Sequence, residues 1–268
     1  MELAQGNDDV RELRRQLEET NKAMWSLYKD LDDRNAELDR FALIASHDLK
    51  EPARRVMARL DRLEAECGDR LDAAGKDHVA DMRQTLERMT TLIEALLNFA
   101  RVTSQGGPFA PTDLNAVADE VVADLSSRIR EAEARIELGE LPTIDGDPLQ
   151  LHQLLQNLIG NALKFRKESL PPVIRVTSRL IADDSCEIRV ADNGIGFDPR
   201  YAQQVLQPFR RRHGRGRYDG IGMGLAICDK IATRHGGTIT LDGVLGEGTT
   251  VTVVLPRNHA VRPAPTEA

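Results

Sequence analysis

A heptad pattern of apolar residues at the start of the chain fixes its first element. Side chains recur every three or four positions with charged residues between them, as is typical of a coiled coil. The seam residues are Val10, Leu13, Leu17, Thr20, Met24, Leu27, Leu31, Leu38 and Phe41, interrupted by Arg34. We therefore expect a coiled-coil helix over residues 1–40 that pairs with another helix.

The helical pattern continues past the coiled coil and returns after a turn. It predicts one helix over about residues 9–66, kinked near Pro52 because proline removes a backbone hydrogen bond, and a second over about 75–103. One hairpin cannot bury two long apolar stripes, whereas two hairpins can do so in a four-helix bundle. Residues 41–103 are thus expected to form a dimerisation domain, and the protein a homodimer.

Composition excludes several classes of protein. A formal net charge of −7 argues against a nucleic-acid-binding protein, which normally carries a dominant basic surface. The sequence has neither an apolar run long enough to span a membrane nor a signal peptide, so we expect a cytoplasmic protein. The three cysteines form no CxxC pair, which leaves a disulfide framework or zinc site unsupported.

The chain changes character after residue 103. Residues 104–111 contain Gly and Pro and predict a linker, and residues 112–257 predict an α+β domain with one sheet covered by helices on one face. The expected helices span about 113–131, 148–166 and 222–235, and the expected strands about 134–144, 173–181, 185–191, 237–243 and 249–255. Residues 258–268 are expected to be a flexible tail.

Two asparagines stand among apolar residues of the expected helix 148–166. Asn157 and Asn161 are four positions apart, and Lys164 follows three positions later, so the three share one face. Surface or capping amides would explain them without any function. In the functional interpretation, Asn161 offers a carbonyl oxygen to Mg²⁺, which prefers hard oxygen ligands, and Lys164 meets phosphate oxygens.

Glycine-rich segments follow in the second half of the chain. Asp192 ends an apolar strand and precedes Gly194 and Gly196, which alone is weak evidence because many tight turns look alike. A second segment opens a helix with Gly220, Gly222 and Gly224, and a third carries Thr249. Glycines allow close backbone approach to a ligand, and a helix N-terminus favours phosphate, so together the segments predict a nucleotide site.

Arginines crowd the segment between the first two glycine-rich stretches. The cluster consists of Arg210, Arg211, Arg212, Arg215 and Arg217. It is either a solvated basic surface or a mobile lid whose guanidinium groups grip a triphosphate. In the second case Phe209 would anchor the lid by burying its ring.

These motifs, in this order, resemble the transmitter module of two-component sensor histidine kinases. The resemblance covers about residues 36–257. The residues within the motifs are most similar to those of the phytochrome-type branch. The matching stretches are "SHDLKEP" (46–52, the phosphoacceptor box), "QNLIGNALKF" (156–165, the N box), "DNGIGF" (192–197), "PF" (208–209), "GIGMGLAI" (220–227) and "GEGT" (246–249).

The resemblance implies an ATP-dependent protein histidine kinase whose second domain is a two-layer α/β ATP-binding domain of the GHKL type. His47 would be the phosphoacceptor, at the edge of an apolar helical face, and Asp48 would take the proton from its other ring nitrogen. Asp192 would accept a hydrogen bond from the adenine amino group. The other implied nucleotide-binding residues are Asn157, Asn161, Lys164, Gly194, Gly196, Phe209, Arg215, Gly220, Gly222, Gly224, Leu225 and Thr249.

The family also implies partners and cofactors. ATP, Mg²⁺, a homodimer and the receiver domain of a response regulator are expected, with a sensor domain supplying the input in cis or in trans. Many such kinases carry Thr or Asn four residues after the phosphoacceptor to position water for dephosphorylation of the partner. Glu51 stands there in this chain, so we expect weak phosphatase activity.

Two rival interpretations remain open from the sequence. The wider ATPase family that includes gyrase hydrolyses ATP with a glutamate where this chain has Asn157, and without that base water is poorly activated. The other rival is a pseudokinase scaffold that binds nucleotide and dimerises without transferring phosphate. Autophosphorylation would separate the kinase from the scaffold.

Overall fold

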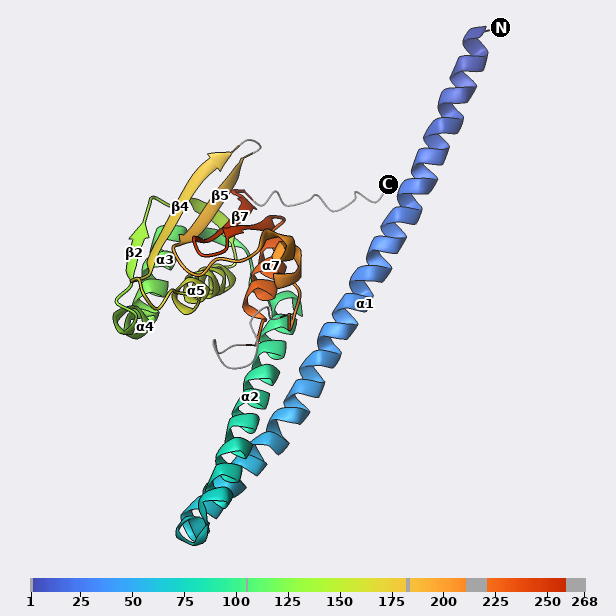
Figure 1. Ribbon diagram of the computed structural model, residues 1–268. Helices are drawn as coiled ribbons and strands as arrows, with labels where there is room; N and C mark the ends of the chain where they lie inside the picture. Colours follow the sequence, from blue (N-terminus) through green and yellow to red (C-terminus); the bar gives the residue numbers. More distant parts are fainter. Residues whose placement is uncertain (1, 105, 182–183, 211–220, 259–268) are drawn as a thin grey trace.

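A long helical hairpin forms the N-terminal part of the computed structural model, which describes residues 2–104, 106–181, 184–210 and 221–258. Helices α1 (Glu2–Cys67) and α2 (Ala73–Ser104) are joined by the short 3₁₀ turn η1 (Gly68–Arg70) and run antiparallel beside each other (Figure 1). The two predicted helices are thereby confirmed. α1 continues through Pro52 as one helix.

An α/β domain follows the hairpin. Its main sheet has the strand order β2–β4–β5–β7–β6, in which β2 and β4 are parallel and the other neighbours antiparallel. These strands are β2 Arg135–Leu138, β4 Val173–Ile181, β5 Ser185–Asp192, β6 Thr238–Val244 and β7 Gly248–Pro256. Two further strands, β1 (Ala110–Asp113) and β3 (Thr143–Gly146), pair with each other in a separate antiparallel ribbon.

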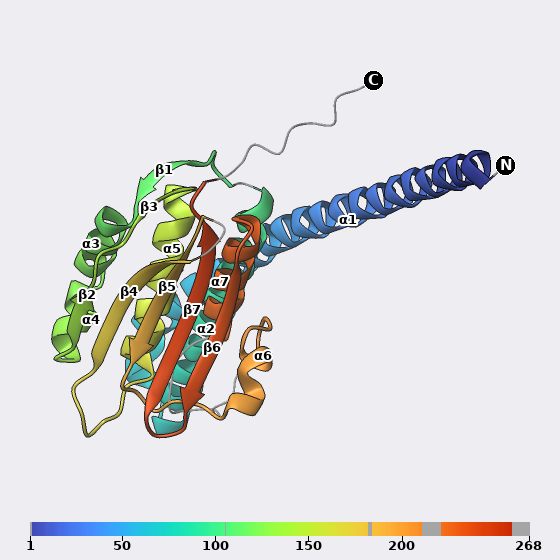
Figure 2. The ribbon, with the colours of Figure 1, turned by 90° about the horizontal axis from the view of Figure 1, so that it is seen from above.

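Helices cover one face of the main sheet (Figure 2). This layer contains α3 Leu114–Asp124, α4 Ser126–Glu131, α5 Pro148–Lys164 and α7 Gly224–Arg234, while η2 Pro199–Tyr201 and α6 Ala202–Val205 lie near β6 at the edge. The predicted arrangement of one sheet with helices on one face is therefore confirmed. The core lies between the layers, where α5 buries Leu151, Leu154, Leu155, Leu158 and Ile159 against strand residues such as Ile174 and Val253.

Local sequence explains how α5 begins. Asp147 caps the helix by accepting hydrogen bonds from the backbone N–H groups of Leu149 and Gln150, at 3.1 Å and 3.3 Å. Pro148 occupies the first turn, where its missing N–H and fixed φ are tolerated. The helix therefore starts at a defined residue, which fixes where Asn157 and Asn161 lie along its axis.

Three expectations about the α/β domain need correction. The single strand expected over 134–144 is two strands in different sheets, β2 and β3, because the segment "GELP" (139–142) turns the chain and Pro142 cannot donate to a ladder. The single helix expected over 113–131 is divided at Leu125 into α3 and α4. β1 begins at Ala110, inside the segment expected to be linker alone.

The hairpin buries apolar side chains on one stripe and exposes them on a neighbouring one. Between α1 and α2 the buried residues are Ala53, Leu60, Val79, Ile93 and Ala100. The exposed ones repeat at seven-residue spacing, as Leu49, Val56 and Leu63 on α1 and Met82 and Met89 on α2. Over the described residues, no helix combines the length and apolar character needed to cross a membrane.

Candidate functional site

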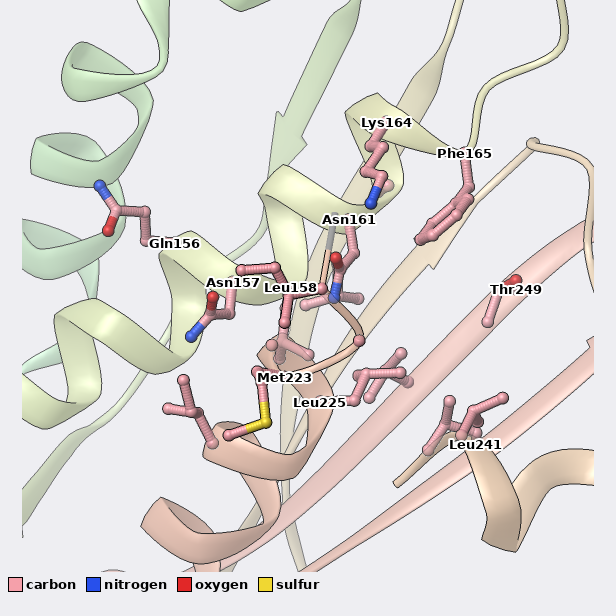
Figure 3. A pocket seen from close by; sticks show the side chains of 18 of the residues that line it. Gln156, Asn157, Leu158, Asn161, Lys164, Phe165, Met223, Leu225, Leu241 and Thr249 are labelled. Atoms are coloured by element: carbon pink, nitrogen blue, oxygen red, sulfur yellow. The ribbon is translucent and has the colours of Figure 1, made fainter. Parts of the chain in front are cut away.

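A cavity of about 520 Å³ opens in the α/β domain where helices and sheet meet. α5 forms one wall, the start of α7 forms another, and the ends of β5 and β7 contribute from the sheet. Figure 3 shows how the labelled side chains point into this space from α5, α7 and the strands. The volume lies in the range of about 300 to 1,000 Å³ that is usual for small-molecule sites.

Four amide side chains of α5 line the cavity, those of Gln153, Gln156, Asn157 and Asn161, and the two asparagines carry the argument (Figure 3). Asn157 and Asn161 are half-buried, and among the described residues neither side chain has a hydrogen-bond partner. A Cβ atom built on Gly224 would lie 3.5 Å from both Asn157 Oδ1 and Asn161 Nδ2, so the amides stand directly over the first turn of α7. Each amide can both donate and accept a hydrogen bond, so this arrangement favours binding of a polar ligand.

Asp192 stands at the end of β5 and is held by two backbone amides. Its Oδ1 accepts hydrogen bonds from Gly194 N at 2.8 Å and from Thr249 N at 3.1 Å. No hydrogen bond from a described residue engages its Oδ2. Burial raises the pKa of Asp192, although the two amides act in the opposite direction. The carboxyl group is therefore fixed in position and leaves one oxygen for a donor on a ligand.

Two glycines allow the turns around Asp192 to pack closely. A Cβ on Gly248, where φ is +136°, would lie 1.9 Å from the backbone oxygen of Asp192. A Cβ on Gly196, where φ is +61°, would lie 1.9 Å from the backbone oxygen of Val244. Only glycine fits at either position, because both the space and the backbone conformation exclude a side chain.

The cavity collects most of the predicted nucleotide-binding residues. Those that line it are Asn157, Asn161, Lys164, Asp192, Gly196, Gly222, Gly224, Leu225 and Thr249. Lys164 Nζ lies over the ring of Phe165, 4.7 Å from its centroid, and Gly194 adjoins the site through its hydrogen bond to Asp192. Arg215 and Gly220 lie outside the described residues.

Phe209 does not behave as expected. Its side chain is 48% exposed and does not line the cavity, so the prediction that its ring is buried is wrong. Its backbone has a left-handed φ of +61°.

The predicted phosphoacceptor segment belongs to α1. His47 lies in that helix, but its side chain is outside the described part of the structure. Asp48 is exposed, and of the residues described in α1 none lines the cavity. Most of the predicted nucleotide-binding residues thus meet in one place, and Asp48 does not lie among them.

Sequence reasoning missed one wall of the cavity entirely. Thr91, Glu94, Ala95 and Asn98 of α2 line it, although α2 belongs to the hairpin. Periodicity identifies only the apolar stripe of such a helix, and polar residues on its outer side read as a solvated surface. The apolar lining residues Ile195, Phe197 and Met223 were also missed, although they flank the predicted glycines.

A buried polar cluster holds α2 and the segment after it against the α/β domain. Arg234, at the end of α7, binds Asp147 Oδ2 at 3.0 Å, Gln150 Oε1 at 2.8 Å and the backbone oxygen of Gly107 at 2.7 Å. Asp147 also accepts the backbone N–H of Gly107, and Gln150 donates to the backbone oxygen of Val102 at 2.7 Å. We call these residues the joint.

Aromatic stacking completes the joint. Phe109 stacks on the ring of His235 with centroids 4.5 Å apart, and the Arg234 guanidinium lies 4.8 Å from the Phe109 ring centroid. His235 is 3% exposed, and its Nε2 accepts the backbone N–H of Asp147 at 3.0 Å. The segment predicted as a linker is thus bound to the start of α5 and the end of α7, two of the helices that line the cavity.

The donor set of the cavity fits Mg²⁺ only as a partner of bound phosphate. Among the described residues, no group of three or more His, Cys, Asp or Glu side chains could form a metal cage. Mg²⁺ normally keeps several waters and takes one or two protein oxygens together with substrate phosphates. The unpartnered Asn161 amide satisfies that limited requirement.

Comparisons with known proteins agree with the geometry of the cavity. The family model for histidine kinase-, DNA gyrase B- and HSP90-like ATPases matches residues 146–259. Cyanobacterial phytochrome A of Nostoc sp. is 40% identical over 230 residues, which cover 86% of this chain and 30% of that protein. Phytochrome-like protein Cph1 of Synechocystis sp. is 39% identical with the same coverage.

A solved structure is similar over most of the chain. It is that of full-length ShkA in complex with AMPPNP, with a TM-score of 0.63 and 27% identity, and the match covers 84% of this chain and 47% of ShkA. The chain therefore spans less than half of ShkA and less than a third of the two cyanobacterial relatives.

Proposed function

The chain contains a histidine kinase transmitter module, and on that premise we propose that it binds ATP in the cavity, transfers the γ-phosphoryl group to His47 and then to an aspartate of a response regulator. One observation carries the proposal. The unpartnered amides of Asn157 and Asn161 on α5 and the anchored carboxyl of Asp192 at the end of β5 face the same cavity.

Each end of the cavity suits one end of ATP. The Asp192 Oδ2 atom can accept a hydrogen bond from the adenine amino group beside the apolar Ile195 and Leu241. Asn161 and Lys164 would meet the phosphates, with the positive N-terminus of α7 at Gly224 close by. Asn161 would hold Mg²⁺, which neutralises charge on the phosphates when bound. AMPPNP in the similar ShkA structure supports a nucleotide ligand.

The transfer needs little from the protein beyond position and charge. One ring nitrogen of neutral His47 would form a bond to the γ-phosphorus as the bond to the β,γ-bridging oxygen breaks. ADP leaves with that electron pair, and Asp48 takes the proton from the other ring nitrogen. No glutamate stands at position 157 to activate water, which favours transfer to histidine over hydrolysis.

The exposed apolar stripe supports the proposed homodimer. Leu49, Val56 and Leu63 repeat every seven residues beside the stripe that packs within the hairpin. A second hairpin could cover this stripe and complete a four-helix bundle. In this proposal residues 1–40 are a coiled-coil signalling helix, 41–103 the dimerisation and phosphotransfer domain, 104–111 the linker, 112–257 the ATP-binding domain and 258–268 a tail.

The proposal is tested with γ-labelled ATP and Mg²⁺. We expect label on the protein that is labile to acid, stable to alkali and absent from His47→Ala. ATP labelled at the α-phosphate is the control and should leave no label. Protein that binds ATP but takes up no label in the presence or absence of a receiver domain would support the scaffold interpretation instead.

A further inference from the structure

An acidic side chain stands in the wall that α2 contributes to the cavity. Glu94 lines the cavity beside the neutral side chains of Thr91 and Asn98. Among the described residues that line it, Glu94 and Asp192 are the two acidic ones. The proposed function places Asp192 at the adenine. Glu94 is therefore the carboxylate whose position relative to the phosphates decides how much negative charge the cavity accepts.

Contacts near the end of α2 show how this helix runs past the cavity. Gln150 of α5 donates to the backbone oxygen of Val102 at 2.7 Å and accepts a bond from Arg234, at the end of α7, at 2.8 Å. Earlier in both helices, Lys230 Nζ lies 4.4 Å from the ring centroid of Phe99. Because the residue numbers fall together in these contacts, α2 and α7 run in the same direction. Moving back along α2 therefore leads toward the first turn of α7.

The same spacing places the acidic residue of α2 at that first turn. Glu94 precedes Phe99 by five residues, and Leu225, which precedes Lys230 by the same number, lies in the first turn of α7. Equal numbers of residues cover equal lengths of two helices. The two asparagine amides of α5 stand over this turn, where the proposed function places the phosphates. Glu94 thus belongs to the phosphate end of the cavity.

A lysine of α1 offsets the charge of this carboxylate. Lys50 Nζ lies 2.7 Å from Glu94 Oε1, and the two side chains are 47% and 50% exposed. Thr91 offers no donor in its place, because its hydroxyl group donates to the backbone oxygen of Glu87 at 2.7 Å. At physiological ionic strength, charges act over a screening length of about 8 Å. The pair therefore makes this wall neutral, and either partner alone would leave a charge near the phosphates.

We infer that the Lys50–Glu94 pair sets the preference of the cavity for ATP over ADP. This inference rests on the proposed function. ATP has a third phosphate, farthest from the adenine, and the negative charge of that group is the most sensitive to this wall. With the pair closed, the wall accepts the third phosphate. When α1 moves Lys50 away, Glu94 repels it, so the position of α1 and the choice of nucleotide are linked in both directions.

Calorimetry with ADP and with AMPPNP, an ATP analogue that retains three phosphate groups, tests this inference in the presence of Mg²⁺. Lys50→Met should weaken AMPPNP binding by about two- to five-fold, the range expected for one exposed charge, and Glu94→Gln should tighten it by a similar factor. ADP affinity should change less in both variants. The double variant, whose wall is again uncharged, should regain the wild-type affinity.

A second ion pair on α1 provides the matched controls. Arg62 and Glu66 form an exposed pair of the same kind, and neither residue lines the cavity. Arg62→Met and Glu66→Gln should therefore leave both affinities unchanged. At about 1 M salt, where the screening length falls to about 3 Å, the changes caused by Lys50→Met and Glu94→Gln should disappear. Changes that persist at this salt concentration would contradict an electrostatic origin and overturn the inference.

The outcomes separate this inference from the proposed function. Wild-type protein that binds neither nucleotide would contradict the nucleotide site itself. Wild-type affinities in Lys50→Met and Glu94→Gln, or equal changes for ADP and AMPPNP, would overturn only the role of the pair. Weaker AMPPNP binding to Glu94→Gln would overturn it as well, because the carboxylate would then attract the Mg²⁺ ion more strongly than it repels the phosphates.

Discussion

The α/β domain and the α1–α2 hairpin differ in where their apolar side chains lie. In the domain, α5 buries a continuous set of residues, among them Leu155 and Ile159, that are almost inaccessible to solvent. In the hairpin, buried positions such as Leu60 and Ile93 stand next to exposed ones such as Val56 and Met89. One part has its core within the chain, and the other leaves a stripe that a second surface could cover.

The two parts of the molecule also differ in how firmly their side chains are held, which suits one part for binding and the other for regulation. The residues that could bind a nucleotide are fixed by turns and hydrogen bonds inside the α/β domain, as Asp192 is by Gly194 and Thr249. The contact between α1 and α2 within the hairpin is of another kind: the Lys50–Glu94 pair is about half exposed on both sides. Partly exposed contacts can be exchanged at low cost, so the position of α1 against α2 is the feature that an input signal could change.

The largest effect is expected in the core of the domain. Ile159 is fully buried, so Ile159→Ala should lower the free energy of unfolding by about 2 to 5 kcal/mol through lost burial and the cavity left behind. Leu149→Ala in the same helix is the control, because Leu149 is 82% exposed and should matter little. If chemical denaturation showed that both variants lose the same free energy of unfolding, Leu149 would have to be covered by another part of the protein.

Asp192→Asn should separate ligand binding from stability. The Asn oxygen would keep the hydrogen bonds from Gly194 and Thr249 and turn its NH₂ group toward the adenine amino group. ATP affinity, measured by calorimetry, should fall by about ten- to a hundred-fold because a hydrogen bond to a charged group is lost.

The same substitution should stabilise the free protein. Burial raises the pKa of Asp192 above its value in the unfolded chain, so the ionised carboxylate costs stability at pH 7. That cost disappears as the pH falls through the raised pKa, and the gain from Asp192→Asn should shrink with it. Asp119→Asn on the surface of α3 is the charge-matched control. A lower melting temperature for Asp192→Asn at pH 7 would contradict this account.

A smaller effect should appear on the exposed stripe of the hairpin. If a second hairpin covers it, Val56→Ala should weaken dimerisation by about 1 kcal/mol for each chain, from the loss of apolar area. Sedimentation equilibrium measures the change, and Arg54→Ala, away from the stripe, is the control. A wild-type protein that sediments as a monomer at all concentrations would remove the dimer from the proposal.

Sequence patterns predicted the parts of the molecule that depend on short-range spacing. The four-residue interval between Asn157 and Asn161 places both amides on one face of α5, and the glycines after Asp192 indicate a turn that excludes side chains. Most predicted nucleotide-binding residues therefore meet in the cavity. The helices of the hairpin followed from periodicity for the same reason.

Features that depend on contacts between distant segments could not be predicted. Arg234 and Asp147 form the joint although they are 87 positions apart, and no pattern relates them. Glu94 and Asn98 line the cavity only because α2 packs against α7, whereas their spacing alone describes a solvated surface. The exposed ring of Phe209 belongs here too, since its expected burial depended on contacts with other segments.

The smallest effects come from two glycines that contrast the hairpin with the domain. A Cβ on Gly68 in η1 or on Gly246 in the β6–β7 turn would meet no atom within 4 Å, so the two sites differ in backbone conformation alone. Gly246 has a φ of +86°, and Gly246→Ala should cost about 1 kcal/mol. Gly68 has no such φ, and Gly68→Ala should stabilise the protein by about 0.4 to 1 kcal/mol by restricting the unfolded chain. In thermal denaturation, the melting temperature should fall for Gly246→Ala and rise for Gly68→Ala. A lower melting temperature for Gly68→Ala would indicate that the hairpin turn is packed against a second chain.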